Sequence, residues 1–152
     1  MDIKRSLFIL DDFCKANGIE YTVTGTVALS MLGVPSSPND IDIKVFNLKE
    51  EQEAKLNELQ FLSGLGKENY KGGECFSFLI NGIKINVLVN NIENYDETTS
   101  QGVTVDLIDK AHAKYHSISI QMVFPALMDK MRLRRDKDKA YMLNLINKLS
   151  SL

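Results

Sequence analysis

The chain has 152 residues, of which 44% are hydrophobic and 25% charged, with a formal net charge of −2 at pH 7. This size and composition are typical of one globular domain, and no apolar run approaches the ~20 residues of a membrane-spanning helix. The near-neutral charge gives no basis for extended nucleic-acid binding. We therefore expect a single domain over residues 1–152, with no membrane contact.

Cysteine usage and the N-terminus predict a cytoplasmic protein. Cys14 and Cys75 lie far apart in apolar surroundings, without the spacing of a zinc site, which favours two buried thiols. The first apolar stretch has acidic residues on both sides and no small-residue cleavage site, unlike a signal peptide.

The first half of the chain alternates helices with short strands. Apolar residues at helical spacing predict a helix over residues 2–17, and β-branched residues predict a strand over 19–25. A short apolar helix follows from Thr26 to Gly33. Residues 40–45 alternate strictly between polar and apolar and predict a second strand. The segment LKEEQEAKLNELQFL then predicts a charged surface helix.

The second half begins with a hairpin. Asn81-Gly82, the strongest short-range hairpin signal, joins the strands CFSFLI and IKINVLVN. Residues 103–116 predict a short strand or turn that leads into a helix, and residues 117–122 alternate like an edge strand. A helix that begins at Pro125 and a final helix at about 138–149 end the chain.

This order of elements predicts the α+β class, with a small twisted mixed β-sheet and helices packed mainly on one face. We expect the core at about residues 18–110 and a helical C-terminal part at about 111–152.

Asp40 and Asp42 are the first candidate site residues. They stand two apart on the second strand, so their side chains share one face, about 6–7 Å apart. A divalent cation relieves their repulsion, and magnesium is typically held by one or two carboxylates together with substrate phosphates. In the alternative interpretation Asp40 caps a turn and Asp42 pairs with Lys44 or Lys84.

A candidate phosphate site precedes this pair. A strand ends at Gly25 and a helix begins at once, which exposes free N–H groups and the positive end of the helix dipole. Gly25 permits a close approach of the backbone, and Thr26 adds a hydroxyl. Neither GxxxxGK nor GxGxxG occurs here, but the carboxylate pair about fifteen residues later favours a nucleotide site.

The segment TGTVALSMLGVPSSPNDIDIKV, a glycine-led helix followed by a D-x-D strand, resembles the signature of the nucleotidyltransferase superfamily with the polymerase-β-like fold. It is most similar to small bacterial members grouped with antibiotic nucleotidyltransferases and abortive-infection toxins. The C-terminal ALMDKMRLRRDKDKAYMLNLI resembles the late helix pair of that group. The resemblance covers roughly residues 20–46 and 83–146.

The resemblance implies that Gly25 and Thr26 hold nucleotide phosphates and that Asp40 and Asp42 are catalytic and hold Mg2+. It also implies a third catalytic carboxylate on a later strand, and Asn86 occupies that position here. Asparagine can offer a neutral carbonyl oxygen to a metal, but it cannot act as a general base.

Other residues have less defined roles. Glu74 and Asp106 are the nearest acids by sequence that could replace the missing carboxylate. The resemblance implies that Lys130 points toward the triphosphate, with Arg135 and Asp138 on the same wall. The alternative for these last three is the solvated face of a surface helix, held by i,i+3 and i,i+4 pairs.

These observations leave three interpretations of function. The chain transfers a nucleoside monophosphate from a nucleoside triphosphate to an unknown hydroxyl-bearing acceptor with Mg2+. Alternatively, it is a catalytically impaired binding or regulatory module of the toxin–antitoxin type, marked by Asn86. A third interpretation makes the aspartates turn and surface residues. Because the chain has little beyond a minimal core, a homodimer that completes the substrate site is a further hypothesis.

Overall fold

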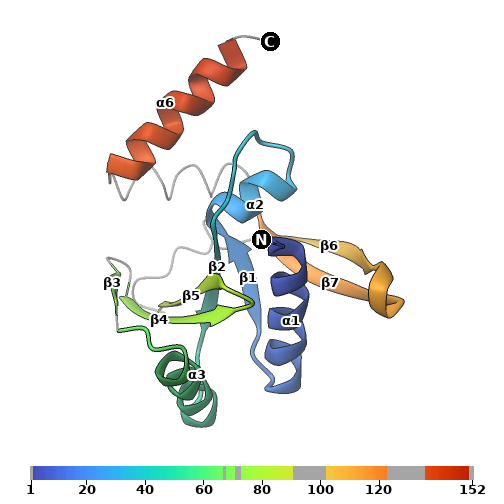
Figure 1. Cartoon of the computed structure of the whole chain (residues 1–152), viewed down its shortest axis with the longest axis vertical. Coiled ribbons are helices and arrows are strands. Elements are labelled where there is room, and N and C mark those ends of the chain that lie inside the picture. The colour runs from blue at the N-terminus through green and yellow to red at the C-terminus, as the bar shows by residue number, and fades with distance from the viewer. Residues whose placement is uncertain (1, 67, 71–72, 91–101, 123–135, 151–152) are drawn as a thin grey trace.

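The computed structural model describes residues 2–66, 68–70, 73–90, 102–122 and 136–150 (Figure 1). Its helices are α1 (Ile3–Ala16), α2 (Gly25–Met31), α3 (Glu50–Leu62) and α6 (Asp136–Ser150), with a 3-10 turn η2 (Lys110–His112). Its strands are β1 (Tyr21–Thr24), β2 (Asp40–Phe46), β3 (Glu68–Tyr70), β4 (Gly73–Ile80), β5 (Ile83–Asn90), β6 (Gly102–Asp109) and β7 (Lys114–Gln121).

The strands form one mixed sheet in the order β3-β4-β5-β2-β1-β7-β6. The central strand β2 runs antiparallel to β1 and parallel to β5, and β1 runs parallel to β7. The outer ladders, β3 with β4, β4 with β5 and β6 with β7, are antiparallel. The predicted α+β class with a mixed sheet is therefore confirmed.

The hydrophobic core lies on one face of this sheet. On β2, Ile41, Ile43 and Val45 are at most 1% exposed. Leu10 of α1 and Leu56 of α3 belong to the same buried cluster. Since α1 contacts β2, β4 and β7 while α3 contacts β4, the two helices cover this face (Figure 1). Because side chains alternate along a strand, the intervening residues of these strands, many of them polar, point to the opposite face.

Side chains from α3 and its C-terminal end close one edge of the sheet. β3 pairs only with the first residues of β4, so the N–H groups of Ser77 and Leu79 point past its end. Gln60 Oε1 accepts from the Ser77 N–H at 3.0 Å, and Ser63 Oγ accepts from the Leu79 N–H at 3.0 Å. Edge donors satisfied in this way cannot recruit a foreign strand.

The C-terminal half differs from the prediction in one region. Residues 103–116, expected to lead into a helix, instead form β6, the η2 turn and the start of β7. Ala113, with φ of 48°, reverses the chain after a single helical turn. β7 is an inner strand between β1 and β6, so 117–122 is not an edge strand and the sheet continues well past residue 110.

The remaining elements follow the sequence, with two qualifications. The helix expected from Pro125 lies outside the described residues, whereas the final helix is α6. β3 was not predicted.

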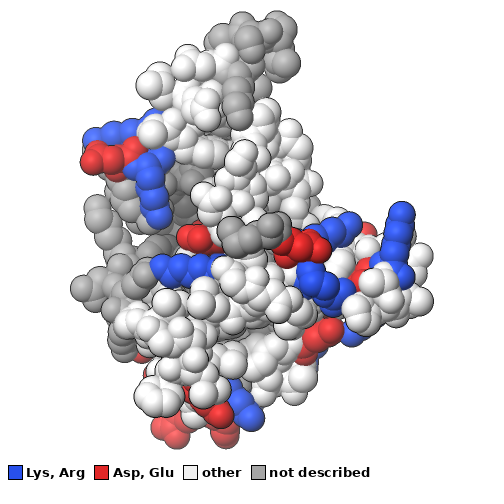
Figure 2. All heavy atoms as spheres, in the orientation of Figure 1, with Lys and Arg blue, Asp and Glu red and all other residues white. Residues whose placement is uncertain are grey.

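The surface of the described part shows no single dominant charge. None of its helices is long and apolar enough to cross a membrane. Basic and acidic side chains lie beside one another across the face in Figure 2. This mixture agrees with the net charge of −2.

We expect Gln60→Ala to lower the free energy of unfolding by about 1–2 kcal/mol, because the N–H of the buried Ser77 loses its acceptor. Gln60→Glu keeps an acceptor oxygen and should lose less than half as much. Urea denaturation followed by circular dichroism measures both. Equal losses in the two variants would contradict the capping role.

Candidate functional site

Five strands each contribute one polar side chain to a row across the sheet, on the face away from α1 and α3. We call this set the polar row, and it consists of Ser77 on β4, Asn86 on β5, Asp42 on β2, Thr24 on β1 and Gln121 on β7. The strand register places neighbouring members directly opposite one another from β4 to β1. Gln121 follows Ile120, which is paired with Val23, so it stands beside Thr24.

Hydrogen bonds link the polar row on both sides of its centre. Ser77 Oγ donates to Asn86 Oδ1 at 2.8 Å, and Asn86 Nδ2 donates to Asp42 Oδ1 at 2.8 Å. On the other side the Thr24 hydroxyl donates to Gln121 Oε1. Ser77 and Gln121 are fully buried and Thr24 is 4% exposed. Buried groups paired in this way hold each other in defined positions.

Gly25 lies against the carboxylate at the centre of the row. Its φ is 67°, and a Cβ at this position would lie 2.7 Å from Asp42 Oδ2. Both the left-handed backbone and the close approach exclude a side chain here. The loop before β2 also folds back toward this point, since Ser36 Oγ donates to the carbonyl of Thr26 at 3.4 Å. The structure therefore brings Gly25 against Asp42, with Thr26 next in the chain at the start of α2.

Asp40 lies on the same face of β2, two residues before Asp42, and both side chains are partly exposed. Its partner in the register on β5 is Lys84. The two aspartates therefore have the common orientation that the sequence predicts. Their role as metal ligands stays a prediction.

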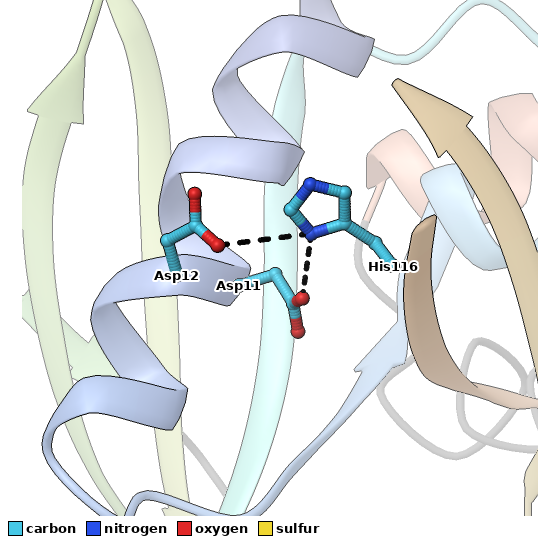
Figure 3. Close-up of side chains that lie close together, drawn as sticks. All are labelled: Asp11, Asp12 and His116. Carbon is cyan, nitrogen blue, oxygen red and sulfur yellow. Dashed lines mark hydrogen bonds and ion pairs between the residues drawn. The ribbon is translucent and has the colours of Figure 1, made fainter. Parts of the chain in front are cut away.

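A second group of possible metal ligands lies on the other face of the sheet. Asp11 and Asp12 of α1 and His116 of β7 offer ligand atoms within 4.8 Å of one another (Figure 3). His116 Nδ1 is 2.7 Å from Asp11 Oδ2 and 4.0 Å from Asp12 Oδ1. Sequence reasoning missed this group, because more than a hundred residues separate its two parts and His116 was expected on a helix.

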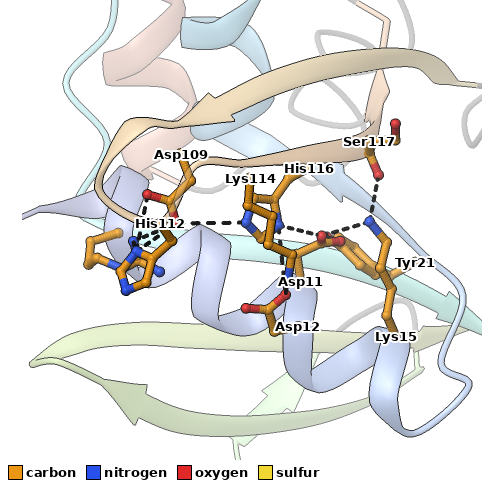
Figure 4. Close-up of polar contacts among 10 residues, drawn as sticks. Asp11, Asp12, Lys15, Tyr21, Asp109, His112, Lys114, His116 and Ser117 are labelled. Carbon is orange, nitrogen blue, oxygen red and sulfur yellow. Dashed lines mark hydrogen bonds and ion pairs between the residues drawn. The ribbon is translucent and has the colours of Figure 1, made fainter.

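Ion pairs already occupy these carboxylates. Lys15 Nζ donates to Asp11 Oδ2 at 2.7 Å, and the Lys114 ammonium donates to Asp12 (Figure 4). The Tyr21 hydroxyl also donates to Asp11 Oδ1, at 2.6 Å. Oxygen and nitrogen donors of this kind are compatible with a divalent ion. The contacts as they stand, however, form an ion-pair network that ties the β6–β7 hairpin to α1.

This network changes the acid–base properties of its members. Burial by itself raises the pKa of Asp11, but hydrogen bonds from Lys15, Tyr21 and His116 together hold that pKa below its ordinary value. Burial, and then the Asp11 charge, raise the pKa of the Cys14 thiol to about 12. Cys14 is therefore an inert core residue at neutral pH.

Comparison with known proteins supports the fold. The sequence matches no protein-family model and no curated protein. The structure aligns with a Thermotoga maritima crystal structure, itself provisionally described as a nucleotidyltransferase, with a TM-score of 0.56 and 16% identity over 97% of this chain and 96% of that chain. The chain has a nucleotidyltransferase-like fold. An antigenic nucleotidyltransferase-like protein from Paracoccidioides brasiliensis also aligns, with a TM-score of 0.46 and 13% identity over 91% of this chain and 71% of that chain.

Within this fold, neither acid considered as a replacement for the third carboxylate reaches Asp42. Glu74 alternates with the buried Phe76 and Phe78, so it faces the core side of β4 rather than the polar row. Asp106 lies on β6, three strands and about 14 Å from β2, where it accepts from the hydroxyl of Ser117 on β7. Among the described residues, no third acid or histidine groups with Asp40 and Asp42.

The residues implied for the triphosphate wall are mostly not described. Lys130 and Arg135 lie outside the described residues, and Asp138 lies on α6. The structure instead adds Ser77, Thr24 and Gln121 to the candidate site. The sequence signal for Ser77 is a hydroxyl between two phenylalanines in the otherwise apolar segment CFSFLI.

We expect Gly25→Ala to lower the free energy of unfolding by about 2–4 kcal/mol, because it adds a clash with Asp42 to left-handed strain. Gly33→Ala is the matched control, since Gly33 also has a positive φ but a Cβ there meets nothing within 4 Å. It should lose about 1 kcal/mol. Urea denaturation of both variants measures the difference, and similar losses would contradict the close approach.

We expect Asp11→Asn to cost about 3 kcal/mol at pH 7, because it removes the buried charge that Lys15 and His116 each approach at 2.7 Å. The folded pKa of Asp11 is depressed, so its stabilising effect is complete above about pH 4 and is lost as the pH falls through the folded pKa. The gap between wild type and variant should therefore narrow on acidification.

Asp12→Asn provides the control, since the Asp12–Lys114 pair lies at the surface and should contribute no more than about 1 kcal/mol. Urea denaturation between pH 3 and 7 measures all three proteins. A gap for Asp11→Asn that stays constant over this range would show that its charge is unimportant.

Proposed function

We propose that this chain is a nucleotidyltransferase that transfers a nucleoside monophosphate from a nucleoside triphosphate to a hydroxyl-bearing acceptor with Mg2+. The contact between Gly25 and Asp42 carries the proposal. It joins a glycine-led turn, suited to phosphate, to a carboxylate of the D-x-D pair. The nucleotidyltransferase-like fold, which extends over nearly the whole chain, also supports the proposed activity.

The donor set fits magnesium. Asp40 and Asp42 are partly exposed carboxylates on one face. Asn86 lies opposite Asp42, and its amide oxygen, which accepts from Ser77 in this structure, would be a further hard ligand once turned toward Asp42. Gly25 keeps clear the space beside Asp42 Oδ2 that a Cβ would fill. Bound there, the ion would neutralise phosphate charge and stabilise the negative charge that develops during transfer.

The chain's own residues would bind and orient the substrates. Gly25, without a Cβ, lets phosphate approach the backbone, and the Thr26 hydroxyl adds a donor. The acceptor hydroxyl oxygen forms a bond to the α-phosphorus as the bond to pyrophosphate breaks, and the hydroxyl proton passes to solvent. Asn86 cannot take the acceptor's proton, so in this proposal it positions groups rather than acting as a base.

We expect calorimetric titration to show binding of ATP or GTP that requires MgCl2 and weakens at least about tenfold in Asp42→Asn, which removes a ligand charge. Asp106→Asn is the control, because this acid lies three strands away and should leave binding unchanged. Release of pyrophosphate from bound nucleotide in the presence of hydroxyl acceptors then measures transfer.

The other outcomes separate the competing hypotheses. Nucleotide binding that ignores both magnesium and Asp42→Asn would indicate a retained pocket in a binding or regulatory module. No binding of either nucleotide would leave Asp40 and Asp42 as surface residues of a nucleotidyltransferase-like fold.

A further inference from the structure

We propose that Ser77 is a positioning residue that sets which end of the Asn86 amide faces Asp42, and that this amide turns over when a divalent cation binds. The inference rests on the proposed function, because it takes Asp42 as a cation ligand. It adds a residue and a conformational step that the D-x-D pair alone does not require.

The hydrogen bonds of the polar row have a direction. An ionised carboxylate only accepts, so Asp42 requires the Nδ2 end of Asn86, which donates to it at 2.8 Å. The Oδ1 end is then turned to Ser77, whose hydroxyl donates to it at 2.8 Å. Every proton in this chain of bonds points toward Asp42, and the amide presents no oxygen to a cation beside that carboxylate.

The reverse direction is also chemically complete. A hydroxyl both donates and accepts, so Ser77 Oγ can accept from Nδ2 once the amide has turned over. Its own proton then needs an acceptor, and Cys75 Sγ lies 3.8 Å from Ser77 Oγ. In this state Asn86 Oδ1 and Asp42 Oδ1 face each other, which is unfavourable without a cation and favourable with one between them.

Ser77 is fixed where this exchange needs it. Its side chain is fully buried, and its N–H is held by Gln60 from α3. Solvent does not reach this hydroxyl, so a water molecule that replaced it would have to enter a closed site at a substantial cost. Rotation of the Ser77 hydroxyl and rotation of the Asn86 amide are therefore coupled. Cation binding at Asp42 selects the state in which Asn86 Oδ1 faces Asp42.

The role of Ser77 depends on the amide at position 86. In Ser77→Ala the turned Nδ2 group would be buried without an acceptor, so cation binding should weaken about tenfold. Asn86→Asp has two equivalent oxygens and no N–H to satisfy, so no turn is needed. In that background Ser77→Ala should change cation affinity less than about threefold.

The experiment is a double-mutant cycle on the full chain, with Mn2+ alone as the probe and free Mn2+ counted by electron paramagnetic resonance. The proteins are wild type, Ser77→Ala, Asn86→Asp and the double variant, with Asp42→Asn as the blank. Unequal effects of Ser77→Ala in the two backgrounds support the proposal. Equal effects, or none, overturn it, because a purely structural hydroxyl would act alike in both.

Failure of the proposed function gives a different result. If neither wild type nor Asn86→Asp binds Mn2+, the cation site itself is absent and both proposals fall. If Asn86→Asp binds and wild type does not, the site stands and the turning amide is refuted.

A second measurement covers a Ser77→Ala variant that does not fold. In the wild type, nuclear magnetic resonance follows the two Nδ2 protons of Asn86 during titration with diamagnetic Mg2+. Transfer from a carboxylate to a hydroxyl acceptor should move the bonded proton upfield. Unchanged signals at saturation would overturn the proposal.

Discussion

The alternation of β2, held between β1 and β5, is the constraint on which the rest of the structure depends. It gives Ile41 and Ile43 to the core and Asp40 and Asp42 to the opposite face. A slip of one residue would exchange the two sets. Since burial of unpaired carboxylates costs several kcal/mol each, the residues that build the core also fix the orientation of the candidate site.

Polar contacts, rather than apolar packing alone, hold the two ends of the sheet. At one end Gln60 and Ser63 satisfy the edge of β4, which fixes Ser77. At the other end the described register between β1 and β7 runs through one pair, Val23 and Ile120. Besides the burial of Ile118 and Ile120 in the core, ion pairs with α1 hold the β6–β7 hairpin in place.

These ion pairs and one hydrogen bond lie along one side of α1 and reach three points of the hairpin. Arg5 bonds Asp109 at 2.7 Å, Asp11 bonds His116 at 2.7 Å, and Lys15 donates to the Ser117 carbonyl at 3.2 Å. By placing β7 they place Gln121 beside Thr24. A network on the core face thus supports the polar row on the opposite face, through the strand that they share.

Local signals in the sequence predict local structure here, and pairings distant in sequence escape them. Helical periodicity predicts α1 and α3, Asn81-Gly82 predicts the hairpin of β4 and β5, and alternation predicts the common face of Asp40 and Asp42. Residues 103–116 mislead, because their one helical turn at η2 is closed by Ala113 and tertiary pairing extends both flanks as strands.

The polar row could not be assembled from the sequence for the same reason. Asn86 meets Asp42, and Gln121 meets Thr24, only through sheet pairings that span tens of residues. Ser77 meets Asn86 across the predicted hairpin, so only this part of the row is local in sequence. Glu74 is a case in which sequence proximity misleads. Its position at the start of the hairpin favoured it as a ligand, but the alternation of side chains along β4 turns it to the face opposite Ser77.

Asparagine at position 86 has a physical consequence for the carboxylate opposite it. A third carboxylate there would stand directly opposite Asp42 and repel it whenever no cation is bound. The Asn86 amide instead satisfies Asp42 by donation and is itself satisfied by Ser77, so the row is complete without an ion. The row is therefore stable as it stands. Under the proposed function, a neutral ligand at this position would lower cation affinity, and substrate phosphates would supply the missing negative charge.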